Sequence, residues 1–138
     1  MRPFELIEHT ADVGIRAFGS SREEVFQNAA AGMFGIITDT GLVKEKECVE
    51  VRVVADDLET LLVEWLNELL YLSDSRSLLF SRFEIRRLGE TSLDASACGE
   101  QADIQHHELK ADIKAATYHM LKMERTAAGW QAQVIFDI

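Results

Sequence analysis

The sequence lacks the features that mark membrane and secreted proteins. No apolar run approaches the roughly 20 residues needed to cross a bilayer, and the N-terminal residues 1–5 lack the long apolar stretch of a secretory signal. Cysteine is scarce, because only Cys48 and Cys98 are present, far apart and outside any CxxC motif. We interpret both as reduced thiols that pack as small hydrophobic side chains. These absences predict a cytoplasmic protein without a membrane anchor.

Basic residues are also few. Twenty-four Asp and Glu residues against fourteen Lys and Arg residues give a formal net charge of −10. Nucleic-acid affinity depends largely on Lys and Arg neutralising phosphates, so this balance argues against strong direct nucleic-acid binding. An acidic protein can still act in RNA metabolism by docking on a basic partner protein, because charge complementarity speeds encounter and orients the surfaces.

Motifs of known catalytic machinery are absent too. The chain contains no nucleophile elbow, P-loop, GxGxxG or HExxH pattern. This absence weakens the case for a self-sufficient enzyme. The pair His106 and His107, followed by Glu108, looks like a fragment of a metal site, but neighbouring residues of a strand point to opposite faces. We therefore interpret both histidines as loop residues.

Two helices are predicted from periodicity and capping residues. The first begins after Ser20 and Ser21, where Ser21 and Glu24 have the spacing of a capping box, and it presents one apolar face over about four turns. The second begins after Asp56 or Asp57 and ends in the polar turn 73–77. Its wide apolar face predicts burial against a sheet.

Extended patterns account for most of the remaining chain. Predicted strands lie at 4–9, 13–19, 47–55, 79–88, 92–98, 107–122 and 130–138. A turn at 126–129 separates the last two, and Gly129 suits a positive φ there. The sequence thus predicts a single α+β domain over residues 1–138, with two main helices packed on mixed or antiparallel β-sheet.

The C-terminal end carries a pair of carboxylates. The last strand-like run closes with Asp137 and Ile138, which places the terminal carboxylate of Ile138 beside the Asp137 side chain. Two carboxylates held this close repel each other, and a bound cation relieves the repulsion. The alternative is an ordinary last strand whose acids remain solvated.

A polar run interrupts the first two apolar segments at 9–12. Within it, Asp12 either caps a turn or approaches Asp137 and the C-terminus. In the second case three anionic oxygens converge, which suits Ca²⁺ or Mg²⁺ and does not suit zinc or copper.

The segment 110–119 contains two more candidates. If it forms a strand, Lys114 shares a face with Ala116 and Tyr118, while His119 lies on the opposite face. Lys114 then either extends to the rim of the sheet or neutralises the acidic site and contacts phosphate. His119 is either a hydrogen-bonded core histidine or a functional acid or base.

Three runs in this order resemble the archease family: HTADVG at 9–14, KAATYH at 114–119 and VIFDI at 134–138. The resemblance extends over the whole chain. Family members usually have Asp where this chain has Glu8, which leaves only the role of Glu8 open.

The resemblance implies an accessory protein that is not itself an enzyme. Archeases assist the RtcB-type RNA ligase by promoting its GTP-dependent guanylylation and multiple turnover, in tRNA splicing and RNA repair. The family's metal site, often assigned to calcium, maps to Asp12, Asp137 and the carboxylate of Ile138, and Mg²⁺ or Mn²⁺ remain alternatives. His9, Lys114 and His119 are candidates for contacting partner or phosphate. Two other functions stay open: a chaperone or specificity modulator of an RNA-modifying enzyme such as a tRNA methyltransferase, and a stand-alone metal-dependent hydrolase.

Overall fold

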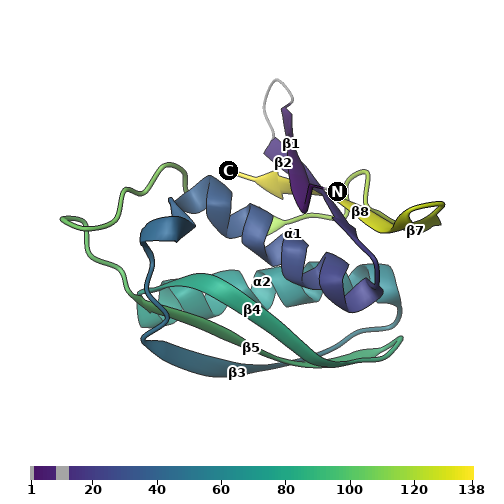
Figure 1. Ribbon diagram of the computed structural model, residues 1–138, viewed down its shortest axis with the longest axis horizontal. Coiled ribbons are helices and arrows are strands. Elements are labelled where there is room, and N and C mark those ends of the chain that lie inside the picture. The colour runs from purple at the N-terminus through teal and green to yellow at the C-terminus, as the bar shows by residue number, and fades with distance from the viewer. Residues whose placement is uncertain (1, 9–12) are drawn as a thin grey trace.

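The computed structural model describes residues 2–8 and 13–138, and it shows two antiparallel sheets with a layer of two helices between them (Figure 1). The larger sheet has the order β1-β2-β8-β6, with β7 also paired to β8. Its strands are β1 (Phe4–Glu8), β2 (Val13–Gly19), β6 (Ala115–Ala116), β7 (Lys122–Thr126) and β8 (Gly129–Asp137). The smaller sheet has the order β3-β5-β4, with β3 at Glu47–Val54, β4 at Leu78–Leu88 and β5 at Ser92–Gln101.

Both helices begin where their capping residues predict. Helix α1 (Arg22–Ile37) starts after Ser21, whose hydroxyl accepts a hydrogen bond from the Glu24 amide at 3.1 Å. Helix α2 (Leu58–Arg76) starts after Asp57, whose carboxylate accepts one from the Thr60 amide at 2.8 Å. These bonds satisfy amides that the first helical turn leaves without partners. A short 3₁₀ turn, η1 (Thr40–Leu42), follows α1.

The core fills the space between the two sheets. Trp65 of α2 is fully buried, and its indole N–H donates to the carbonyl of Phe26 in α1 at 3.0 Å. Along β3 the side chains alternate, so Val49, Val51 and Val53 face the helices while their neighbours face outward. The predicted α+β fold is confirmed, and every strand pairing in the described residues is antiparallel.

The predicted strand at 107–122 is wrong over most of its length. Only Ala115–Ala116 and the first residue of β7 pair in the sheet. Upstream, Leu109 forms a single bridge with Thr38, and the Lys110 amide donates to the carbonyl of Ile37. The segment runs along the end of α1 and the side of α2 and not beside a neighbouring strand. Its apolar residues therefore do not indicate a run of paired strand residues. Helix α2 also continues through the predicted turn to Arg76, and Ser77 caps it with a positive φ.

The interpretation of the two cysteines as reduced thiols is also wrong in this structure. Cys48 and Cys98 form a disulfide with their Cα atoms 4.0 Å apart. They are direct register partners on β3 and β5, 50 residues apart in sequence. Sequence spacing could not reveal the pairing because a long connection, including α2, separates the two strands.

None of the described helices is both long and apolar enough to cross a membrane.

Candidate functional site

The C-terminal end of β8 lies between two other strands of the larger sheet. On one side Val13, at the start of β2, pairs with Phe136. On the other side Ala115, at the start of β6, pairs with Asp137. The chain end therefore meets the first residues of two strands that are far away in sequence, and the C-terminus is seen beside β2 in Figure 1.

Backbone hydrogen bonds fix the arrangement around Asp137. The Lys114 amide donates to the Asp137 carbonyl at 2.8 Å, and the Thr117 amide donates to the Ile135 carbonyl at 2.9 Å. The side chains of Lys114 and Asp137 are exposed, and Ile138 is 53% exposed. The backbone is thus held by the sheet, while the charged groups remain available to a ligand or partner.

Two further predicted residues, His9 and Asp12, lie outside the described residues. The described residue that follows Asp12 is Val13, which pairs with Phe136, the residue that precedes Asp137. Convergence of Asp12 with Asp137 and Ile138 therefore stays a prediction.

Asn67 of α2 holds the outer edge of β6. Its side-chain carbonyl accepts from the Ala116 amide at 2.8 Å, and its side-chain amide donates to the Ala116 carbonyl at 3.1 Å. A carboxamide thus occupies the place of a neighbouring strand, which satisfies backbone groups of a residue that is only 4% exposed. Sequence reasoning missed Asn67 because it marks no motif, although a polar residue amid the apolar positions of α2 is a usable signal.

The residues after β6 form a turn that presents side chains to solvent. His119 is exposed, so of its two alternatives the core histidine is wrong, and its amide donates to the Thr117 hydroxyl at 3.3 Å. Tyr118 is 56% exposed, and its hydroxyl donates to Glu64 of α2 at 3.1 Å. Partial desolvation raises the pKa of the Tyr118 hydroxyl, and the Glu64 carboxylate raises it further. Lys114 lies outside β6 and is exposed, whereas Ala116 is buried, so the shared face that a continuous strand would give does not form.

A groove of about 950 Å³ lies between the C-terminal half of α2 and the segment 109–115. Leu70, Leu78 and Ile113 contribute apolar walls, while Asp74 and Lys114 are among its charged lining residues. The groove therefore reaches the same segment that pairs with the end of β8.

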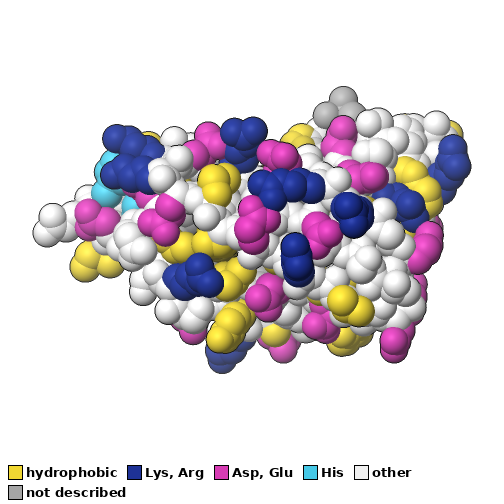
Figure 2. Space-filling view, turned by 90° about the horizontal axis from the view of Figure 1, so that it is seen from below, with side chains coloured by type: hydrophobic (Ala, Val, Ile, Leu, Met, Phe, Trp, Pro, Cys, Tyr) yellow, Lys and Arg dark blue, Asp and Glu magenta, His cyan; other side chains and the backbone are white. Residues whose placement is uncertain are grey.

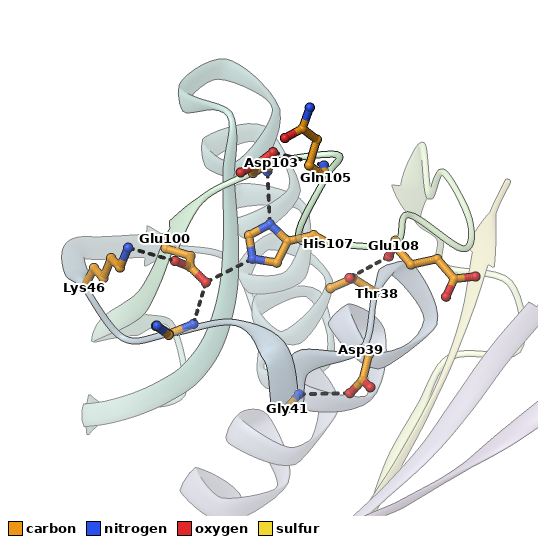
Figure 3. A network of polar contacts seen from close by, with 10 residues as sticks. Thr38, Asp39, Gly41, Lys46, Glu100, Asp103, Gln105, His107 and Glu108 are labelled. Carbon is orange, nitrogen blue, oxygen red and sulfur yellow. Dashed lines mark hydrogen bonds and ion pairs between the residues drawn. The ribbon is translucent and has the colours of Figure 1, made fainter.

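A buried polar network anchors the segment that leads into this groove (Figure 3). Glu100 of β5 and His107 are 6% and 4% exposed, and His107 Nε2 lies 2.9 Å from Glu100 Oε2. The Lys44 amide donates to the same carboxylate at 2.8 Å, and the Lys46 ammonium lies 3.4 Å from its other oxygen. The pKa of Glu100 is lowered to about 2. The hydrogen bond from the Lys44 amide has the largest effect, and the His107 ring and Lys46 lower the pKa further.

The same network contains the one group of three candidate metal ligands in residues 2–8 and 13–138, formed by Glu100, His106 and His107. The two histidines lie in a loop, as predicted, and their rings are 4.8 Å apart. Residues of a turn are free of the strand alternation that would send the two rings to opposite faces. Nevertheless, His107 Nδ1 accepts a hydrogen bond from the Asp103 amide at 3.0 Å.

This acceptor role places the ring proton of His107 on Nε2, facing Glu100. A metal-bound histidine needs the opposite arrangement, with its free nitrogen donating to an acceptor. We therefore assign the Glu100–His107 pair to structure, as a bond that fixes the loop 102–107.

Comparison with known proteins is consistent with the sequence motifs. The family model of the archease protein family matches residues 4–138. The chain is 45% identical to protein archease of Methanosarcina acetivorans, over 99% of this chain and 97% of the relative. It is 43% identical to protein archease of Thermococcus gammatolerans, with both chains fully covered.

Two solved structures share the fold. The solution structure of protein 1598 from Methanobacterium thermoautotrophicum superposes with a TM-score of 0.87 at 38% identity, with both chains fully covered. The crystal structure of a Thermotoga maritima protein, described as an archease and possible chaperone, gives a TM-score of 0.62 at 29% identity over 100% of this chain and 98% of the other.

Proposed function

The chain belongs to the archease family, and on that basis we propose that it is a non-catalytic accessory protein that activates an RtcB-type, GTP-dependent RNA ligase. The observation that carries this proposal is the convergence of β2, β8 and β6 at the C-terminal end of the chain. The described parts of the three runs that resemble the family lie in these strands, at 13–14 in β2, 115–116 in β6 and 134–137 in β8.

The proposed working tip consists of Asp12, Asp137 and the terminal carboxylate of Ile138 around a divalent cation. Carboxylate oxygens suit Ca²⁺, and also Mg²⁺ or Mn²⁺. The exposed Asp137 side chain, on a backbone fixed by the sheet, supports this assignment. When bound, the cation supplies charge neutralisation and positioning to phosphate groups.

Lys114 is the proposed phosphate contact. Its amide is bonded to the Asp137 carbonyl while its ammonium group is exposed. A cation on a fixed backbone beside an acidic tip favours an anionic group of the partner complex. His119, exposed in the following turn, and His9 are the further candidates for partner contact.

The partner surface is expected to be basic. A net charge of −10 favours association with a positively charged protein, and the rate of this association should fall with added salt. This charge argues for recognition of the ligase protein and against strong direct recognition of its RNA.

The test is reconstitution with the ligase, GTP, a divalent cation and an RNA that carries a 3′-phosphate or 2′,3′-cyclic phosphate and a 5′-hydroxyl end. Omitting this protein should lower covalent GMP on the ligase and limit the reaction to a single turnover. Lys114→Ala should weaken activation, whereas Lys110→Ala, which removes a nearby lysine, should leave it intact. An unchanged guanylylation rate with the protein omitted would refute the proposal.

The description of the Thermotoga maritima relative as a possible chaperone favours one other candidate. In that case the protein modulates an RNA-modifying enzyme such as a tRNA methyltransferase. Affinity capture that recovers a methyltransferase and no ligase would favour this function. Turnover of nucleotides by the purified protein alone would instead favour a metal-dependent hydrolase.

A further inference from the structure

The Cys48–Cys98 disulfide lies on the outward face of the three-stranded sheet. Val49 and Val51 of β3 point into the core, and Cys48, which precedes Val49, points the other way. Figure 2, which views the molecule from the side of this sheet, shows Lys and Arg side chains interleaved with Asp and Glu. The bond therefore lies among solvated charges. One pair, Arg86–Glu50 at 2.6 Å, joins the outer strands β4 and β3 on the same face of the sheet.

The backbone holds the two cysteines opposite each other independently of the bond. The β3–β5 register runs without a shift from Glu47↔Gly99 to Val54↔Ser92 and includes Cys48↔Cys98. Directly opposite residues of an antiparallel pair lie on the same face with their side chains in contact range. Reduction therefore does not require the strands to separate, and the two thiols remain placed to form the bond again.

The two sulfur atoms are not equivalent. Cys48 is exposed, whereas Cys98 on the central strand is 9% exposed. On its other side Cys98 is covered by β4, where Arg82 is its register partner. Access thus favours attack at Cys48, which makes Cys98 the leaving group.

We propose that this pair is a thiol–disulfide exchange site for a dithiol reductant. One thiolate of the reductant attacks Cys48 Sγ, the bond to Cys98 breaks, and Cys98 leaves as a thiolate that takes up a proton. The second thiol of the reductant loses its proton and displaces Cys48 from the mixed disulfide, and the Cys48 thiolate is then protonated. Overall the protein gains two electrons and two protons, and the dithiol becomes a disulfide. This inference does not rest on the proposed function.

The first experiment treats the native full-length protein with dithiothreitol, then alkylates the thiols and measures intact mass. We expect both cysteines to become labelled without denaturant, at a rate proportional to dithiothreitol concentration. In a parallel sample, the reductant is removed and oxidised glutathione is added before alkylation. The disulfide should then form again and the protein should stay unlabelled. The proposal is overturned if labelling needs denaturant, if its rate is independent of dithiothreitol, or if the oxidised pair does not form again.

Single variants test the assigned roles of the sulfur atoms. With oxidised glutathione, Cys98→Ser, which leaves Cys48 free, should form a mixed disulfide several-fold faster than Cys48→Ser. Equal rates for the two single-cysteine variants would overturn the assignment.

Discussion

The side chain of Asn67 makes two hydrogen bonds to the backbone of Ala116, one as donor and one as acceptor. This pair connects the middle of α2 to β6, which in turn pairs with Asp137 at the end of β8. One carboxamide therefore supports the backbone of the candidate site from a distant part of the sequence.

Asn67→Ala should destabilise the protein by about 1–3 kcal/mol, because it leaves the buried amide and carbonyl of Ala116 without these partners. Urea denaturation measures the change. Glu68→Ala, on the next residue of the same helix, serves as the control and should change stability by less. Equal losses of unfolding free energy in the two variants would mean that the two Asn67–Ala116 hydrogen bonds do not account for the change.

Acidification should remove the stabilising contribution of Glu100. Its pKa is lowered from 4.5 to about 2 in the folded protein, so the unfolded chain binds more protons between these values. The contribution is complete above about pH 5 and decreases as the pH falls towards 2. Denaturation at several pH values should show that the free energy of unfolding falls less steeply below about pH 5 in Glu100→Gln than in the parent. An equally steep fall in the two proteins would contradict this role.

Gly99→Ala should cost about 3 kcal/mol or more, since an added Cβ would overlap the backbone carbonyl of Leu79 on the neighbouring strand. Gly89→Ala is the matched control. Its added Cβ meets nothing closer than 3.7 Å, and the expected change is within about 0.5 kcal/mol. Thermal or urea unfolding of both variants distinguishes a steric requirement from a general effect of replacing glycine.

Calcium affinity should depend on the C-terminal carboxylates if the proposed tip binds the ion. Asp137→Asn, or one residue added after Ile138, should weaken binding at least about tenfold while the fold remains intact. Asp112→Asn removes another exposed acid from the segment beside β8 and should have little effect. Titration calorimetry measures the affinities, and circular dichroism checks the fold. Unaltered binding after both changes at the C-terminus would exclude these groups as ligands.

Most of the secondary structure could be predicted because local signals coincide with it. Ser21 and Asp57 cap the two helices as predicted, and Gly129 adopts a φ of 140° in the last turn. Alternating valines mark β3 because one face of that strand meets the core and the other meets water. The periodic signal failed at 107–122, where the backbone bonds to the end of α1 and to the side-chain amide of Asn67 more than to a neighbouring strand.

The candidate site could be predicted only in part. The residue pattern identified Lys114 and Asp137 as candidates, and the structure joins their backbones. The sequence prediction missed the roles of Asn67 and of the buried Glu100–His107 pair, since the contacts of each depend on a residue from another element.

The sequence by itself determined the helix starts, the outward and inward faces of β3, the acidic character and the family, because capping, alternation, charge and motifs are local properties of the chain. Only the tertiary structure decided which distant residues meet: Cys48 with Cys98, Asn67 with Ala116, and the start of β6 with the end of β8. Such contacts depend on strand order and register, which are set by burial of the whole core between two sheets and not by any single segment.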